Sequence, residues 1–199
     1  MKTLQHYITE KILINKNSKI SYIYHPKTKD ELEDIIKQKI KSEGNECDLN
    51  DIDTSNITNM SSLFLNSDFN GDISKWNVSN VTDMAMMFMW SKFNGDISKW
   101  NVYNVKNMRG MFSSSKFNGD LSNWDVSNVT NMDGMFFASK FDDDISNWNV
   151  SNVTNMASMF YESVFNSDIS NWDVSNVKYM GRMFDNCPIK EKYKPKFKI

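Results

Sequence analysis

The hydrophobic positions of this chain recur at a fixed interval. The clearest unit is FNGDISKWNVSNVTDMAMMFMWSK, residues 69–92, in which Phe, Ile, Trp, Val and Met are separated by polar residues. Four more copies follow without insertion as far as residue 188, and a weaker copy covers residues 45–68. Six units of 24 residues therefore span residues 45–188. A fixed period of this length indicates a solenoid, in which each unit buries its apolar face against its neighbours.

Two spacings within a unit predict its secondary structure. Trp76 and Val78 lie two residues apart, which is the side-chain period of a strand. Met84, Met87 and Phe88 follow at the spacing of one helical turn. We therefore expect an α/β solenoid whose coils each contain a strand, a turn, a short helix and a second turn. Stacked coils would pair their strands into one parallel sheet, and the Trp, Phe and Met columns would form the core.

Residues 1–44 do not repeat, and their apolar spacing predicts helices. A short amphipathic helix is expected over 3–13 and an extended link over 19–25. A second helix is expected over 28–43, because it begins with a Thr-x-x-Glu capping box and ends before Gly44. We expect this segment to be a helical cap on the first coil, since terminal repeats need one. The alternative is a separate docking helix.

Residues 189–199, IKEKYKPKFKI, form a basic tail in which lysines alternate with mostly apolar residues. This alternation suits an extended segment laid over the last coil with its apolar side chains inward. Lys and Pro on the outer edge would block end-to-end pairing of sheets, so removal of the tail should cause association. The alternative is a free basic tail that attracts acidic partners.

The net charge of −2 over 199 residues hides a segregation of charge. Residues 45–188 carry nine Lys and Arg against eighteen Asp and Glu, whereas both flanking segments are basic. Phosphate binding requires clustered cations. We therefore expect no nucleic-acid binding by the repeats.

The sequence predicts neither export nor membrane insertion. No apolar run approaches the roughly 18 residues of a spanning helix, and the first residues lack the apolar region and cleavage site of a signal peptide. No Cys follows an apolar leader, so a lipid anchor is not expected either. We expect a chain that is cytoplasmic at synthesis and that would reach a virion or a cell surface by another route.

The repeat resembles a known family. The order Ile73-x-x-Trp76-x-Val78-x-x-Val81 matches the strand consensus of leucine-rich repeats, and the unit W-(N/D)-V-S-N-V-T-N-M-x-x-M-F-x-x-S is similar to the BspA-like leucine-rich repeat over residues 45–188. The resemblance implies a right-handed leucine-rich-repeat-like coil and a non-enzymatic role in protein binding or adhesion, often at a cell surface. The absence of a leader makes the chain resemble members encoded by phages and large viruses.

Two polar columns invite a chemical interpretation. The Asp column precedes each predicted strand, and its carboxylates could hold cations or, as we favour, stabilise turns. The best local metal candidate is the run Asp142, Asp143 and Asp144. The Asn column is expected to point inward and to bind backbone groups at a turn. The Asp column is Asp72, Asp96, Asp120, Asp144 and Asp168, and the Asn column is Asn56, Asn80, Asn104, Asn128, Asn152 and Asn176.

No pattern of residues predicts catalysis. The sequence contains no Ser-His-Asp, Cys-His, P-loop or zinc-binding pattern. Its Ser and Asp residues are abundant, but they recur in columns and do not form a unique cluster. We expect neither an enzyme nor a cofactor.

One column of variable residues predicts a binding surface. Met89, Phe137 and Tyr161 occupy this column, with Trp90 adjacent, and large apolar side chains are typical of interface hot spots. We expect them to form a partly exposed patch that binds a protein partner; the alternative is that they pack against the neighbouring coil. Tyr103, on the Asn-rich face, is the second candidate. We expect a monomer that captures another protein, and the alternative is a structural or assembly component of a phage or virus particle.

Overall fold

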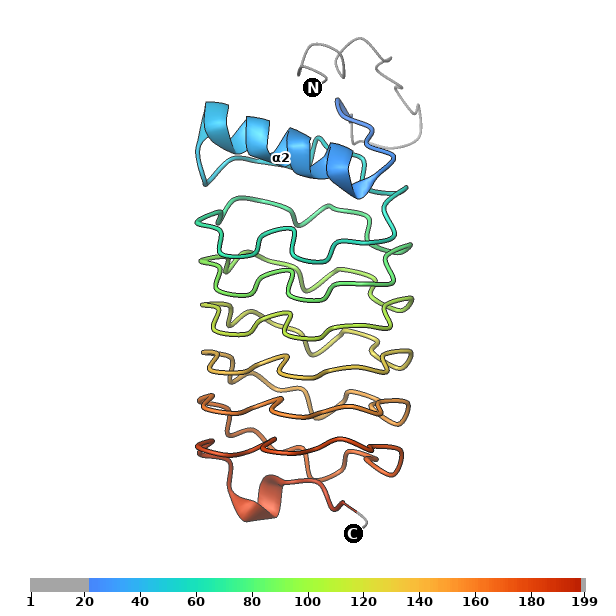
Figure 1. The fold of residues 1–199 in the computed structure, drawn as a ribbon, viewed down its shortest axis with the longest axis vertical. Coiled ribbons are helices and arrows are strands. Elements are labelled where there is room, and N and C mark those ends of the chain that lie inside the picture. The colour runs from blue at the N-terminus through green and yellow to red at the C-terminus, as the bar shows by residue number, and fades with distance from the viewer. Residues whose placement is uncertain (1–21, 198–199) are drawn as a thin grey trace.

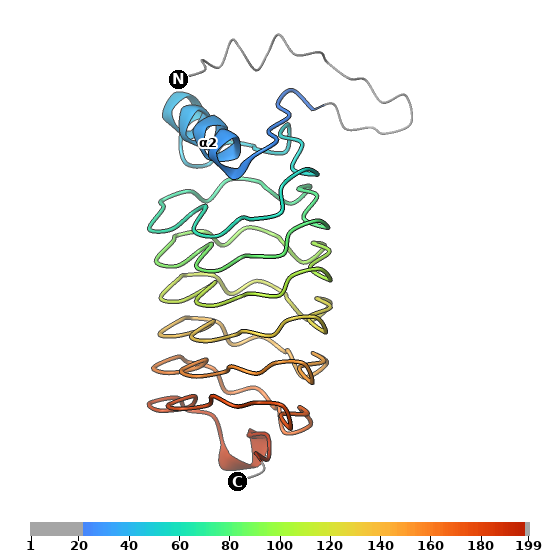
Figure 2. The same ribbon diagram turned by 45° about the vertical axis from the view of Figure 1, so that its right-hand side comes forward.

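The computed structural model describes residues 22–197, and these form one stack of coils (Figure 1). Helix α2, Lys29–Glu43, lies across the N-terminal end of the stack, and the short 3-10 helix η1, Glu191–Tyr193, lies at the other end. A view turned by 45° shows the same order of coils between these two ends (Figure 2). The helix expected over 3–13 lies outside the described residues.

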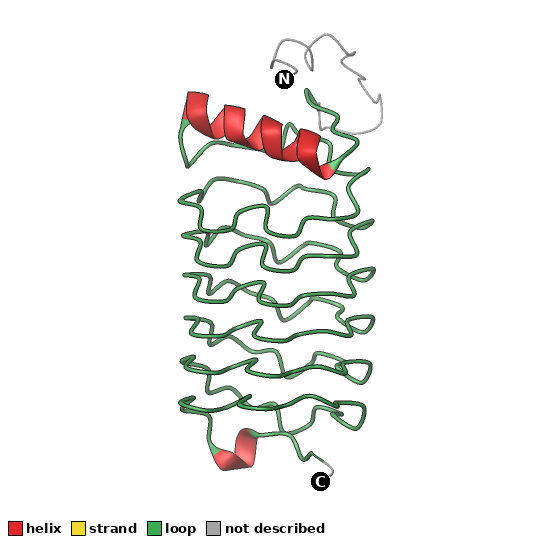
Figure 3. Cartoon of the chain, viewed as in Figure 1, coloured by secondary structure: helices red, strands yellow, loops and turns green. Residues whose placement is uncertain are grey.

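The prediction of a leucine-rich-repeat-like α/β solenoid with a parallel sheet and a short helix in each coil is wrong. Across the described residues, the chain between α2 and η1 contains no helix and no strand longer than an isolated bridge (Figure 3). The bridges are parallel and mostly join equivalent positions of successive coils, as in Asn59 with Asp83 and Asn131 with Asn155. The coils are therefore built from turns.

Left-handed residues explain why no helix forms in the coils. Met86 and Trp90 have φ values of 56° and 58°, and the equivalent residues of the other coils also have positive φ. Such a residue cannot continue a right-handed helix and is typical of the third position of a type II turn. Hydrogen bonds from the Met87 N–H to the Met84 carbonyl, and from the Ser91 N–H to the carbonyl three residues earlier, close two such turns.

A turn also interrupts the predicted strand. The N–H of Trp76 donates to the carbonyl of Ile73 at 3.1 Å, and the N–H of Val81 donates to the carbonyl of Val78 at 2.9 Å. The two-residue spacing of Trp76 and Val78 thus reflects two inward side chains beside turns. It does not mark a strand within a sheet.

Backbone hydrogen bonds between neighbouring coils hold the stack together. On the side that contains the left-handed residues, alternate N–H groups of one coil donate to carbonyls of the next coil at 2.7–3.0 Å. In the second coil the donors are Met84, Met86, Phe88 and Trp90, and the acceptors are Asn107, Arg109, Met111 and Ser113. These bonds fix the register at one 24-residue repeat per coil.

The core consists of aromatic, methionine and aliphatic columns. Phe64 and Phe88 of successive coils stack with ring centroids 5.6 Å apart, and Phe88 stacks on Phe93 of the following coil at 4.5 Å. The Trp column is buried as well, with Trp76 and Trp100 nearly parallel at 6.4 Å. Burial of these large side chains supplies the main driving force for stacking.

Helix α2 confirms the helix predicted over 28–43. The Thr28 side chain accepts a hydrogen bond from the Glu31 N–H, and the Gly44 N–H donates to the Ile40 carbonyl. The capping box differs in one detail, since the Glu31 carboxylate accepts from the N–H of Lys27 and not from that of Thr28. The buried face of α2, which includes Ile35, belongs to the same hydrophobic cluster as the first coil.

The tail lies against the last coil, but its predicted extended conformation is wrong over Glu191–Tyr193, where it forms η1. The carbonyl of Tyr193 accepts from the N–H of Ile169 at 3.0 Å, and Ile189 is buried. Tyr193 and Phe197 pack on the core. The effect of the tail on association stays a prediction.

A candidate protein-binding hollow

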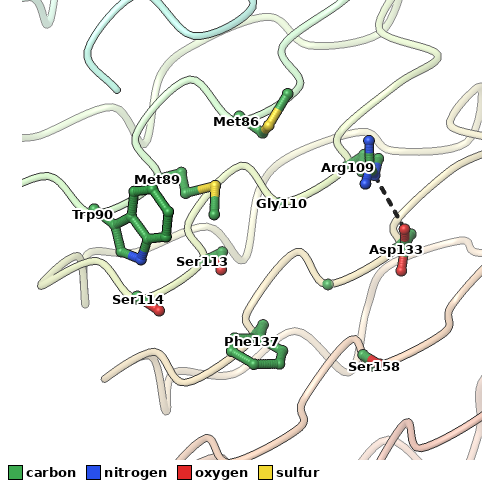
Figure 4. A pocket seen from close by; sticks show the side chains of 11 residues that line it. Met86, Met89, Trp90, Arg109, Gly110, Ser113, Ser114, Asp133, Phe137 and Ser158 are labelled. Atoms are coloured by element: carbon green, nitrogen blue, oxygen red, sulfur yellow. Dashed lines mark hydrogen bonds and ion pairs between the residues drawn. The ribbon is translucent and has the colours of Figure 1, made fainter. Parts of the chain in front are cut away.

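A hollow of about 320 Å³ opens on one side of the stack, mainly across the coils 69–92, 93–116 and 117–140, with Ser158 of the following coil at its border (Figure 4). The turns that contain the left-handed residues supply most of its wall. The lining residues are Met86, Met89, Trp90, Arg109, Gly110, Ser113, Ser114, Asp133, Gly134, Phe137 and Ser158.

The hollow exists because the coil 93–116 has small residues at positions where at least one neighbouring coil has large ones. Gly110, Ser113 and Ser114 belong to the coil 93–116. The coil before it contributes Trp90 and two methionines, and the coil after it contributes Phe137. Figure 4 shows Trp90 and Phe137 on two sides of the space left by the serines. The result is an apolar depression with a polar floor.

Two glycines remove side chains from this wall. Gly110 and Gly134 have φ values of 60° and 59°, and they share a column with Met86 and Ser158, whose φ values are 56° and 53°. Since non-glycine residues adopt the same backbone in other coils, glycine is not required by the turn. A Cβ on Gly110 would lie 3.3 Å from Cγ of Met86, so a side chain at this position would enter the hollow.

An ion pair lies beside the hollow. The Arg109 Nε donates to Asp133 Oδ2 at 3.1 Å, and both residues line the hollow (Figure 4). The Arg109 side chain is more than half exposed, so solvent screens the pair and its contribution to stability is small. The pair places a hydrogen-bond donor, Arg109, and an acceptor, Asp133, next to the apolar depression.

The predicted patch residues occupy or adjoin this hollow. Trp90 is 56% exposed, and Met89, Phe137 and Tyr161 are partly exposed. Tyr161 does not line the hollow, but its ring stacks on that of Phe137 with centroids 5.1 Å apart. Arg182 lies over the other face of this stack, 4.3 Å from the Tyr161 centroid. The apolar surface therefore continues from the hollow toward the C-terminal coil, while its binding role stays a prediction.

Tyr103 lies apart from the hollow. Its side chain is 49% exposed, and it is not among the lining residues. The carbonyl of Tyr103 accepts from the Asn128 side chain at 2.8 Å, as part of the Asn column. The structure thus separates Tyr103 from the other four candidates.

The Asn column has the predicted structural role but not the predicted orientation. Each side-chain amide from Asn80 to Asn176 donates to the carbonyl 25 residues earlier, at 2.7–2.8 Å. These side chains are mostly exposed, so the expectation that they point inward is wrong. They connect neighbouring coils from the outside.

The carboxylates of the metal candidates are occupied by backbone groups. Asp142 accepts from the N–H of Asn166 at 2.7 Å, Asp143 accepts from that of Asp144, and Asp144 accepts from that of Ser146, both at 2.8 Å. The Ser146 N–H and hydroxyl lower the pKa of Asp144. Within residues 22–197, no group of three or more His, Cys, Asp or Glu residues could hold a metal ion. Turn bonds therefore occupy Asp143 and Asp144, and a bond to the next coil occupies Asp142.

Sequence reasoning missed the residues that create the hollow. The signal was the pair MRGMF and MDGMF, residues 108–112 and 132–136, where the other units have a larger residue in place of Gly. It also missed a second interaction column, in which the side-chain oxygen of Asn94 accepts from the N–H of Asn118 at 2.8 Å. The same bond recurs from Asn70 as far as Asn166.

Together these features define a repeat protein of stacked 24-residue coils with an apolar hollow on one side. The family model described as "Mycoplasma protein of unknown function, DUF285" matches residues 31–139 and 114–194, and the chain belongs to that family. No curated protein and no solved structure matches the chain. In the described part of the chain, no helix has the length and apolar character needed to span a membrane.

Proposed function

We propose that this protein is a non-enzymatic recognition module that acts as a monomer and binds a partner protein at the hollow. The observation that carries the proposal is the solvent-facing apolar hollow itself, with Trp90 exposed at its side. The resemblance to BspA-like repeats, whose members bind proteins or adhere to surfaces, supports the same function. The lining contains neither His nor Cys, which supports binding over catalysis.

The chemistry of the hollow favours a particular kind of contact. Its volume suits the insertion of one large apolar side chain, which Met89, Trp90 and Phe137 would surround. The ion pair of Arg109 and Asp133 can bind polar backbone or side-chain groups beside that anchor. We therefore expect a partner segment with a central Leu, Met or aromatic residue flanked by polar residues.

Filling the hollow tests the proposal. Gly110→Met introduces the side chain that Met86 carries at the same backbone conformation one coil earlier. Ser62→Met is the matched control, because Ser62 has the same left-handed conformation in the first coil and does not line the hollow. Peptides selected from a displayed random library with the parent protein supply the probe, and binding is measured by fluorescence anisotropy.

The expected result is that Gly110→Met and Trp90→Ala weaken peptide binding by roughly tenfold or more, about 1.4 kcal/mol, while Ser62→Met binds as the parent does. The selected peptides should share a large apolar residue. Equal affinity of Gly110→Met and Ser62→Met would refute the hollow as the binding site. Thermal midpoints of the variants establish that the fold is retained.

A further inference from the structure

The last coil, residues 165–188, has an edge that the tail leaves open. Tyr179 and Met180 are 63% and 39% exposed, whereas Met156, the equivalent of Met180 one coil earlier, is fully buried. The tail covers a different part of this coil, since its contact runs from Tyr193 to Ile169. Residues 22–197 thus cover only part of the apolar end of the stack.

A row of backbone donors lies along the same edge. In the preceding coil, alternate N–H groups from Met156 to Glu162 donate to carbonyls of the last coil. The equivalent N–H groups of the last coil have no acceptor among residues 22–197. These four groups belong to Met180, Arg182, Phe184 and Asn186. Because the bonds in every other coil run toward the C-terminal end, all four donors face outward from the stack.

The charge around this edge differs from that of the rest of the repeats. Residues 165–199 carry seven Lys and Arg against four Asp and Glu, whereas residues 45–164 carry seven against fifteen. Lys178 is exposed on the edge, and the Nζ of Lys194 lies 5.6 Å from the Phe184 ring centroid. Arg182 is exposed as well, but its guanidinium pairs with Asp185 and stacks on Tyr161 of the preceding coil. A row of outward N–H groups adds further positive potential. The edge therefore favours carbonyl and carboxylate acceptors.

A second copy of this chain fits the edge poorly. Two such edges placed face to face would oppose N–H groups with N–H groups. The opposite end of the stack is covered by α2, which occupies the place where a further coil would stack (Figure 1). Neither end-to-end arrangement satisfies the four donors.

We infer that this edge binds an extended, acidic segment of another protein, which adds to the stack as a further rung. Addition of a strand to an exposed edge is a common mode of peptide recognition, in which backbone bonds supply affinity and side chains supply specificity. Alternate carbonyls of an extended segment lie on the same side about 6.6 Å apart, which suits donors at alternate residues. Apolar side chains of the segment would cover Met180, and acidic ones would face Lys178.

The inference is tested by amide hydrogen exchange, measured residue by residue with NMR on the full chain. The probe is a blocked peptide of about ten residues that alternates Glu with Val, long enough to span the four donors. A peptide that alternates Lys with Val is the matched control probe. Bound acidic peptide should slow exchange at Met180, Arg182, Phe184 and Asn186 by about tenfold or more, because exchange then requires the complex to open.

Two charge variants distinguish binding at the edge from nonspecific electrostatic attraction. Lys178→Glu should weaken the acidic peptide several-fold, whereas Lys140→Glu, at an exposed lysine of an inner coil, should not. Binding without protection of the four amides, or equal binding of the lysine peptide, would overturn the inference. Protection that appears without peptide as the protein concentration rises, together with a dimer in sedimentation, would also overturn it, because the occupant would then be a second copy.

Discussion

Single side chains connect the coils at several points, and the tryptophans show how. In the Trp column, which runs from Trp76 to Trp172, each indole N–H donates to a backbone carbonyl 27 residues earlier, as Trp124 does to Ile97 at 3.1 Å and Trp148 does to Leu121 at 2.9 Å. The rings themselves are at least 96% buried. One residue type therefore fills the core and also gives a second hydrogen bond to a turn carbonyl, since Ile97 already accepts from the N–H of Trp100.

Trp124→Ala should lower the free energy of unfolding by about 3–5 kcal/mol. The substitution removes a buried ring from a central coil and one of the two donors to the Ile97 carbonyl, the other being the N–H of Trp100. Asn123→Ala is the control and should have little effect, because Asn123 is exposed. Urea denaturation measures both. A Trp124→Ala midpoint equal to that of the control would contradict an inward Trp column.

The Asp column should make the stability of the stack dependent on acid pH. Bonds from the Ser122 hydroxyl and N–H hold the pKa of Asp120 below its ordinary value, and the pKa of each other member of the column is lowered as well. A carboxylate whose folded pKa is lowered stabilises the fold above its unfolded pKa, and this contribution is lost as the pH falls through the folded pKa. Stability should therefore fall below about pH 4.

Replacement of all five members of the column with Asn isolates this effect. The Asn side-chain oxygen can still accept the Ser N–H, but it does not titrate. The variant should lose less stability than the parent between about pH 5 and pH 2, measured as the shift of the thermal midpoint. An equally steep loss in both proteins would mean that other carboxylates control the acid response.

At the scale of the element, each coil is a sequence of turns whose left-handed residues are mostly not glycines. The period and the core columns could be predicted, because periodicity depends only on which residues are apolar. The secondary structure could not be predicted from this spacing. The side chains of Met84, Met87 and Phe88 can face the core in one helical turn and also in two consecutive turns that each end on a left-handed residue. The residues that decide between the two, Met86 and Trp90, are types that rarely adopt positive φ.

The candidate site could also be predicted only in part from the sequence. The exposure of Met89, Trp90, Phe137 and Tyr161 could be anticipated, because their columns vary while the core columns do not. The hollow between them could not be anticipated, because it depends on the absence of a side chain at Gly110 and on the stacking of three coils. In the predicted helix, the side chains at these positions would point in other directions than they do in the observed turns.

Helix α2 is the element that covers the first coil, and Ile35 is its fully buried anchor. Ile35→Ala should destabilise the protein by about 2–5 kcal/mol, since the helix covers the apolar end and cannot easily collapse onto a smaller side chain. Lys37→Ala, at a side chain that is 70% exposed, is the control. Chemical denaturation followed by fluorescence compares them. Equal stability of the two variants would mean that α2 does not seal the core.

At the scale of the whole molecule, the stack has two ends and one hollowed side with different chemistry. The N-terminal end is closed by α2, and the hollow lies mainly across the second to fourth coils. The C-terminal edge presents donors that have no acceptor among residues 22–197. Arg182 lies between the last two regions, because it stacks on Tyr161 beside the hollow and belongs to the C-terminal edge.

The central claim is that the coils pair with one another through alternate backbone groups. Amide hydrogen exchange at equivalent residues of the coils tests this claim most directly. The account predicts slow exchange at Met84, Met108, Met132 and Met156, whose N–H groups donate to the next coil, and fast exchange at Met180, which has no next coil. If each coil instead formed its own helix, its hydrogen bonds would lie within the coil. Met180 would then exchange at the same rate as the other four, and that result would contradict the account.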